Sequence, residues 1–259
     1  MTETQDTVAA ALWRARIDGS VVPKPQPGML GDGYGVQARI VENSGEARIG
    51  WKVGSTSPQA QARLGTDQPG AGALLARFCY ASGDVVPIWP RHEPYVEVEF
   101  AFTLRSTLSP RDAPFTREEV EAATGTCHPA LELVGSRVEG GLEAIGRAMI
   151  TADGGGNLAF VSGAGTDAWR EHDLAALMTS LHRNGQRAAE GRGERALGDP
   201  LNVMVWLANH CRERGIPLAA GEIVSTGTCT GLIGVAPGDR LVGDFGPLGQ
   251  VCASLTKAS

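Results

Sequence analysis

Apolar and polar positions alternate along much of the chain after residue 48, in short runs that Gly, Pro and Asp interrupt. A period of two residues between frequent turn residues is typical of β-strands. The runs that fit this pattern are Gly50–Gly54, Val85–Ile88, Tyr95–Leu104, Ala130–Val134, Leu158–Ser162, Glu222–Thr226, Arg240–Phe245 and Gln250–Leu255. The body of the protein is therefore predicted to be rich in β-strands.

Helical spacing of apolar residues is confined to five segments, some of which carry end signals. They are Thr7–Ile17, Gly35–Asn43, Thr116–Thr124, Asp173–Arg183 and Asp199–Arg214. Thr116 and Glu119 form a capping box, and Asn184-Gly185 follows the fourth segment as a stop signal. Three prolines in residues 21–28 exclude a helix there and predict a linker. A few helices among many short strands predict an α+β fold around a curved mixed sheet or barrel, with a small N-terminal helical region.

The composition is that of a folded, acidic protein. The 259 residues include 35 glycines, 23 basic and 29 acidic side chains, and the formal net charge is −6. No block of basic residues is present to neutralise phosphates, which argues against nucleic acid as a partner. No apolar run approaches the roughly 18 residues of a membrane span, and the acidic segment Met1–Asp6 is unlike a secretory signal. Five cysteines without a CxxC pair are typical of reduced thiols, so a cytoplasmic location is expected.

The clearest functional pattern is the strand Tyr95–Leu104, in which apolar residues alternate with Glu97 and Glu99. This alternation places both carboxylates on one face, about 7 Å apart. If that face lines a cavity, the two charges repel each other and lose solvation unless a cation compensates them. The alternative is a solvated outer face of an antiparallel sheet, which is the commoner environment of Glu on strands.

A third carboxylate favours the metal interpretation. Glu132 interrupts the apolar run Pro129–Val134, which is predicted to be a buried strand where an isolated carboxylate needs a partner. Three oxygen-donor side chains without thiolate or imidazole are typical of a hard cation, Mg²⁺ or Mn²⁺. His128 is close to this run, but a single His at the start of a strand is more often structural, and we place it outside the metal site.

Lysine is rare in this chain, which draws attention to Lys52. Only three of the 23 basic residues are lysines, which leaves 23 − 3 = 20 arginines, and Lys52 lies in the glycine-bounded strand Gly50–Gly54. A lysine in this setting can bind a substrate carboxylate or carry a proton. The alternative is a side chain that extends to the surface from the edge of a sheet. The turn Ser225–Gly231 can bind a carboxylate through backbone N–H groups or be an ordinary tight turn.

Several segments together resemble the 2-keto-4-pentenoate (2-hydroxypenta-2,4-dienoate) hydratases, and the resemblance covers nearly the whole chain. The segments that carry it are Trp51–Gly54, Leu64–Pro69, Val96–Glu99, Pro129–Arg137, Leu197–Asn202, Val205–Ala208, Thr226–Thr228 and Pro237–Asp239. That family shares the fold of the C-terminal domain of fumarylacetoacetate hydrolase. The resemblance therefore implies an N-terminal helical cap region over residues 1–75 and a catalytic domain of that fold over residues 76–259.

The resemblance also implies the parts of an active site. Glu97, Glu99 and Glu132 would hold one Mg²⁺ or Mn²⁺, and Lys52 would be the catalytic residue in the substrate pocket. The implied substrate is a 2-oxo or 2-hydroxy-dienoic acid that binds the metal through its carboxylate and C2 oxygen. The implied reaction is a lyase step, such as hydration, through a metal-stabilised enolate. Relatives are commonly oligomeric, so a homo-oligomer is expected.

The sequence departs from the family pattern in the wall of the pocket. Gly70 replaces the acidic residue that handles protons in the hydratases, Tyr95 replaces an Arg, and both join Thr228 as candidate substrate-binding residues. Residues 152–156 read Ala-Asp-Gly-Gly-Gly in place of Ala-Asp-Asn-Ala-Ser. These changes leave open decarboxylation or C–C bond cleavage of an unsaturated 2-oxo acid, or a non-catalytic partner subunit of an active relative. Lys52 and the carboxylate cluster argue against the partner subunit, since a scaffold does not need a costly charged cluster.

Overall fold

The computed structural model describes residues 4–26 and 28–259. Met1–Glu3 and Pro27, which belong to the acidic N-terminal segment and the proline-rich linker, lie outside the described residues. The helices are α1 (Gln5–Asp18), α2 (Tyr34–Ser44), α3 (Pro58–Leu64), α4 (Arg117–Ala123), α5 (Gly141–Ala144), α6 (Gly146–Ala152) and α7 (Pro200–Glu213). The strands are β1 (Arg48–Gly54), β2 (Gly70–Leu75), β3 (Cys79–Ala81), β4 (Val85–Ile88), β5 (Tyr95–Leu104), β6 (Thr124–Val134), β7 (Asn157–Ser162), β8 (Met178–Arg183), β9 (Gln186–Arg192), β10 (Ile223–Thr228), β11 (Ile233–Gly234), β12 (Arg240–Asp244) and β13 (Gln250–Lys257).

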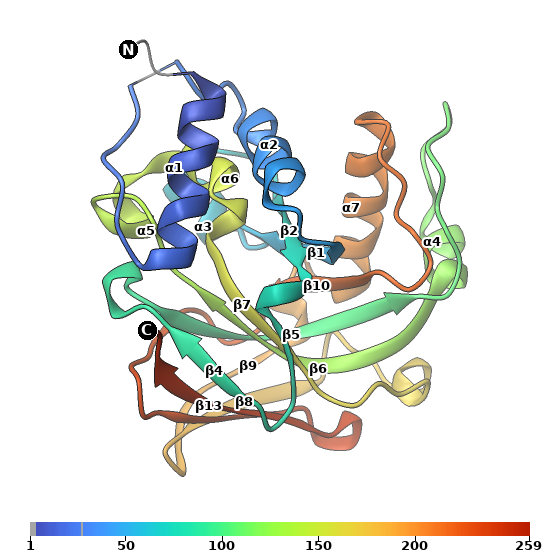
Figure 1. Ribbon diagram of the computed structural model, residues 1–259. Helices are drawn as coiled ribbons and strands as arrows, with labels where there is room; N and C mark the ends of the chain where they lie inside the picture. Colours follow the sequence, from blue (N-terminus) through green and yellow to red (C-terminus); the bar gives the residue numbers. More distant parts are fainter. Residues whose placement is uncertain (1–3, 27) are drawn as a thin grey trace.

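Two sheets form the body of the protein. The larger has the strand order β2-β1-β10-β5-β6-β7-β3, and β11 joins it by pairing with β5. It is a mixed sheet, because β1 pairs with β10 in parallel while β5 pairs with both β6 and β10 in antiparallel fashion. The smaller sheet has the order β4-β13-β12-β8-β9. The long strands β5 and β6 curve across the molecule (Figure 1), and the predicted α+β fold with a curved mixed sheet is confirmed.

The main hydrophobic core lies between the two sheets. On β5, Val98 and Phe100 are fully buried on the face that meets the smaller sheet. The Phe100 ring meets the Phe245 ring edge-on, with 5.0 Å between the ring centroids. Helices α1, α2 and α6 pack together on the other side of the large sheet (Figure 1) and enclose a second core. The β5 face that carries the glutamates is therefore turned away from the main core.

The capping box at Thr116 forms as predicted. Thr116 Oγ1 accepts a hydrogen bond from the backbone N–H of Glu119, and the Glu119 carboxylate accepts one from the backbone N–H of Thr116. Each of these bonds gives a partner to an N–H group that has none within the first turn of a helix. The helix that follows is α4, which ends at Ala123, one residue before the predicted end.

The predicted helix Asp173–Arg183 is wrong. Its second half is β8, which pairs with β12 on one side and with β9 on the other. Asn184-Gly185 is the turn of the β8–β9 hairpin rather than a helix stop, and its φ angles of +54° and +80° are typical of a type I′ turn. The hydrogen bonds that this segment forms with two neighbouring strands stabilise the strand more than its local sequence preference stabilises a helix, because such preferences are weak.

The part of the chain before residue 75 supplies strands as well as helices. Strands β1 and β2 pair with each other, and β1 also pairs with β10, so both belong to the large sheet. The division of the chain at residue 75 stays a prediction. Among the described residues, no helix has both the length and the apolar character that crossing a bilayer requires.

Candidate functional site

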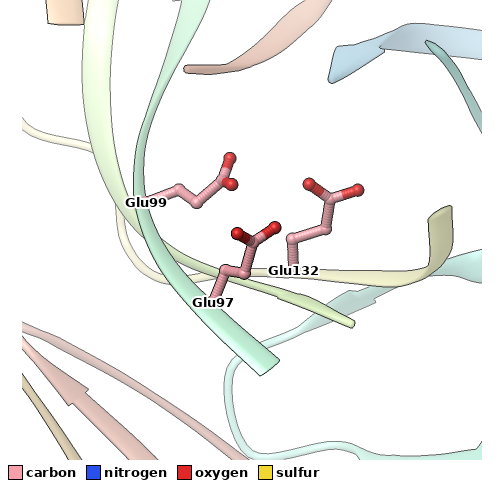
Figure 2. Close-up of side chains that lie close together, drawn as sticks. All are labelled: Glu97, Glu99 and Glu132. Atoms are coloured by element: carbon pink, nitrogen blue, oxygen red, sulfur yellow. The ribbon is translucent and has the colours of Figure 1, made fainter. Parts of the chain in front are cut away.

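Three glutamate side chains converge on one face of the large sheet (Figure 2). Glu97 and Glu99 are two residues apart on β5, and the antiparallel register places Glu132 of β6 directly opposite Glu97. Directly opposed residues of antiparallel strands share a face, with Cβ atoms about 5 Å apart. One carboxylate oxygen from each glutamate lies within 4.8 Å of the other two. Strand pairing thus brings the three predicted metal-ligating residues together, and we call them the carboxylate cluster.

Neighbouring strands orient two of the three carboxylates. Glu99 Oε2 accepts hydrogen bonds from Ser225 Oγ at 2.5 Å and from the backbone N–H of Gly227 at 2.9 Å, both on β10. Glu132 Oε1 accepts a hydrogen bond from Asn157 Nδ2 at 2.9 Å, at the start of β7. Glu99 is 1% exposed and Glu132 is 0% exposed. The alternative of a solvated outer face is therefore wrong.

Lys52 of β1 is the cation that faces the carboxylate cluster. Its Nζ lies 3.3 Å from Glu132 Oε2 and donates a hydrogen bond to the carbonyl oxygen of Gly155 at 3.0 Å. The side chain is 3% exposed, so it does not extend to the surface. Glycines make room for it, since a Cβ atom on Gly155 would lie 2.8 Å from Lys52 Cδ and one on Gly72 would lie 3.1 Å from it. Of the glycines in residues 154–156, Gly155 thus has a steric role beside Lys52.

Burial is the largest influence on the ionisation of the carboxylate cluster. It raises the pKa of all three glutamates because each carboxylate loses solvation, and the pKa of Glu97 rises to about 7. The neighbouring carboxylates raise the pKa of Glu99 further. Burial alone would lower the pKa of Lys52, but the three negative charges around it outweigh that effect and raise the pKa. Keeping all three carboxylates ionised at this buried position therefore costs free energy unless a cation compensates their charge.

The donor atoms of the cluster fit a divalent cation. Glu132 Oε2 is buried and has no hydrogen-bond partner in the described part of the chain, although Lys52 Nζ is within ion-pair distance. When all three are ionised, the carboxylates and the Lys52 ammonium sum to −3 + 1 = −2, which a divalent ion would neutralise, and carboxylate oxygens are the ligands that Mg²⁺ and Mn²⁺ prefer. His128 lies outside the carboxylate cluster, and its ring bonds with Thr103 Oγ1 at 2.9 Å and the Gly163 carbonyl oxygen at 3.0 Å.

A cavity of about 580 Å³ opens beside the cluster. It is lined by Lys52, Glu97 and Glu99 together with the three predicted substrate-binding residues, Gly70, Tyr95 and Thr228. Tyr95 is two residues before Glu97 on the same face of β5, and Thr228 of β10 pairs with Glu99. The fully buried Glu132 is not among the lining residues, but its Oε2 lies 3.3 Å from the Nζ of Lys52, which is. The volume is within the range of sites that bind small molecules.

Three polar residues that sequence analysis missed lie around the site, together with Ser225, which it named only as part of the turn Ser225–Gly231. Ser225 and Asn157 hold the carboxylates as described above, and Arg16 of α1 donates a hydrogen bond from Nη2 to Asn157 Oδ1 at 3.0 Å. Arg147 of α6 lines the cavity. No local pattern marks Asn157, Arg16 or Arg147, because each acts on a segment far away in the sequence, and Arg16 is 141 residues from Asn157. Arg147 is also only one of 20 arginines.

Known proteins that are similar to this chain in sequence are also similar to it in structure. No protein-family profile matches the chain. The chain is 33% identical to a 2-keto-4-pentenoate hydratase from Burkholderia vietnamiensis over 216 residues, which cover 83% of this chain and 81% of that protein. It is 31% identical to a 4-oxalocrotonate decarboxylase from Pseudomonas sp. strain CF600 over 263 residues, which cover 97% of this chain and 98% of that protein.

A solved structure matches the fold over nearly its full length. It is the 4-oxalocrotonate decarboxylase from Pseudomonas putida G7, complexed with magnesium and adipate. The TM-score is 0.87 at 29% sequence identity, and the match covers 98% of this chain and 99% of that chain. The curved mixed sheet and the N-terminal helices are therefore common to both proteins.

Proposed function

The chain belongs to the 2-keto-4-pentenoate hydratase family, and on this premise we propose that it is a divalent-metal-dependent lyase acting on a 2-oxo or 2-hydroxy-dienoic acid. The relatives in the comparison are hydratases and a decarboxylase, both of which are lyases. The observation that carries the proposal is the buried carboxylate cluster facing Lys52 beside a cavity of suitable size. A homo-oligomer and a cytoplasmic location stay predictions from the sequence.

Each part of the cavity has a proposed role. The carboxylate cluster would hold Mg²⁺ or Mn²⁺. When bound, the cation supplies a Lewis acid for the oxygens of the 2-oxo acid. Lys52 Nζ holds a proton beside Glu132, and it serves as the proton carrier or as the anchor of the substrate carboxylate. Tyr95, Thr228 and the wall at Gly70, where the Arg147 guanidinium packs against the backbone, contact the rest of the substrate.

Decarboxylation of an unsaturated 2-oxo diacid is the second candidate, and Gly70 is the observation that favours it. Adding water to a double bond requires a hydroxyl group and a proton to be delivered at different carbons, and the hydratase pattern has an acid at this position. In decarboxylation, the electron pair of the C–CO₂ bond passes into the unsaturated 2-oxo system, CO₂ leaves, and one proton is taken up at carbon. Lys52 alone can supply that proton. The match to decarboxylases over nearly the whole chain supports this alternative.

A turnover screen tests the proposed function. In the presence of Mg²⁺ or Mn²⁺, the protein is expected to convert at least one unsaturated 2-oxo or 2-hydroxy acid, and excess chelator is expected to stop the reaction. Loss of dienoate absorbance without CO₂ release indicates hydration, and CO₂ release indicates decarboxylation. Full activity in excess chelator would contradict the proposal. Failure to convert any such acid, together with tight association with an active relative, would favour the partner-subunit alternative.

Gly70→Asp is expected to raise the hydration of 2-hydroxypenta-2,4-dienoate about tenfold. A positioned acid or base contributes about 10²–10⁴-fold, but a Cβ atom on Gly70 would lie 2.7 Å from Arg147 Nη2, so the new carboxylate would pair with that guanidinium. Steady-state kinetics measures the change, and Gly70→Asn is the matched control of similar size without a charge. An equal increase in both variants would show that filling space, rather than proton transfer, is responsible.

A further inference from the structure

Arg147 fills the space that a side chain at position 70 would occupy. A Cβ atom on Gly70 would lie 2.7 Å from Arg147 Nη2 and 2.9 Å from its Cζ, so the guanidinium packs against the bare backbone of β2. The φ angle of Gly70 lies outside the left-handed region, and the backbone there does not itself require glycine. The glycine therefore leaves room for an arginine that reaches in from α6.

Arg147 and Lys52 lie on the same face of β2. Gly72, two residues after Gly70, lies against the backbone carbonyl of Gly154 and beside Lys52, whose Cδ would lie 3.1 Å from a Cβ atom there. Positions two residues apart on a strand share a face and are separated by about 7 Å. The cavity thus has two cations on one wall, Lys52 beside the carboxylate cluster and Arg147 against Gly70.

The guanidinium of Arg147 is held in place but not neutralised. Nη1 donates to the carbonyl oxygen of Gln68 at 3.0 Å, and Nη2 donates to that of Pro69. A guanidinium has five N–H groups, so three remain without an acceptor among residues 4–26 and 28–259. In that same part of the chain no carboxylate lies within ion-pair distance of Arg147, whereas Arg63, another arginine lining the cavity, pairs with Glu143 at 3.5 Å.

We propose that Arg147 binds the distal carboxylate of a dicarboxylic 2-oxo acid and makes the site selective for diacids over monoacids. This inference rests on the proposed function, in which the 2-oxo acid end of the substrate lies at the carboxylate cluster. The planar fork of a guanidinium matches a carboxylate, and its position is fixed before the ligand arrives.

Two saturated acids that differ only in a terminal carboxylate test the proposal. The probes are 2-oxoadipate and 2-oxohexanoate, and calorimetry measures their dissociation constants with the Mn²⁺-loaded protein. The unaltered protein is expected to bind 2-oxoadipate about 10–100-fold more tightly, since hydrogen bonds between charged groups contribute on this scale. Arg147→Met is expected to remove this preference while leaving the affinity for 2-oxohexanoate unchanged. Arg147→Lys is expected to keep part of it, as a charge without the fork.

Arg63→Met is the matched control, because Arg63 is also an arginine at the cavity but already has a carboxylate partner. It is expected to retain the full preference for 2-oxoadipate. Equal binding of the two acids by the unaltered protein, or a preference that survives Arg147→Met, would overturn the inference and leave the proposed function intact. If neither acid binds in a Mn²⁺-dependent manner, the proposed function itself is wrong and the inference falls with it.

Discussion

Replacing Glu99 by Gln is expected to weaken Mn²⁺ binding at least about 100-fold and to abolish turnover. Changing a group that only orients a metal ligand already costs about 10–100-fold in affinity, and this change removes one of three negative charges in the cluster. Ser225 and Gly227 hold Glu99 Oε2 in place, so the uncharged amide would lie in nearly the same position. Titration with MnCl₂ by calorimetry measures the affinity, and thermal unfolding gives a second measurement.

Thermal unfolding separates loss of metal from loss of fold. Mn²⁺ at 100 times its dissociation constant is expected to stabilise the unaltered protein by about 2.7 kcal/mol, roughly 5–10 °C for a chain of this size, and Glu99→Gln should show no such gain. Glu143→Gln is the control, because Glu143 also lines the cavity but is 81% exposed and pairs with Arg63. Undiminished Mn²⁺ affinity in Glu99→Gln would show that the cluster is not the metal site.

Lys52→Met is expected to reduce turnover by about 10²–10⁴-fold, the contribution of a positioned proton carrier, while the affinity for Mn²⁺ is unchanged or higher. Methionine is an unbranched side chain that fits the space between Gly72 and Gly155. The substitution therefore removes the charge and keeps most of the packing. The affinity for Mn²⁺ should not fall, because the Lys52 ammonium competes with a cation for Glu132. Single-turnover kinetics and calorimetry measure the two quantities separately.

Lys257→Met, at the exposed end of β13, serves as the control for loss of a lysine charge. It is expected to leave both turnover and Mn²⁺ affinity unchanged. A Lys52→Met variant that keeps its rate would remove Lys52 from the mechanism. A variant that loses activity and Mn²⁺ affinity together would assign Lys52 to the architecture of the cluster instead.

Strand alternation was sufficient to predict the carboxylate pair on β5. The predicted strand Tyr95–Leu104 has the same bounds as β5, and a period of two residues fixes the shared face of Glu97 and Glu99 whatever the neighbouring strand is. Glu132 was predictable for another reason, since an isolated carboxylate in a buried strand needs a partner. The direct pairing of Glu132 with Glu97 was not predictable, because register depends on contacts between strands.

Two elements that were not predicted show the limits of prediction from local sequence patterns. Strand β2 consists of Gly, Ala and Leu only, and these residues lack the β-branched and aromatic side chains by which strands are recognised. The segment Asp173–Arg183 has helical spacing, but its second half is a strand held on both sides. Arg147 was missed for a third reason, since its importance depends on the missing side chain at Gly70. Each case depends on neighbours that are distant in sequence.

The contacts from Arg16 through Asn157 to Glu132 tie the carboxylate cluster to the first helix of the chain. Arg16 and Asn157 are 141 residues apart, and contacts over such a separation form only after most of the chain has come together, because closing long loops is entropically unfavourable. Pairing of β5 and β6 brings the three carboxylates together, but the hydrogen bonds that orient Glu132 are complete only when α1 has docked. Tight binding of a cation would then indicate that the whole chain has folded. A short contiguous motif differs in this respect, because it can bind a cation while the rest of the chain is still being synthesised.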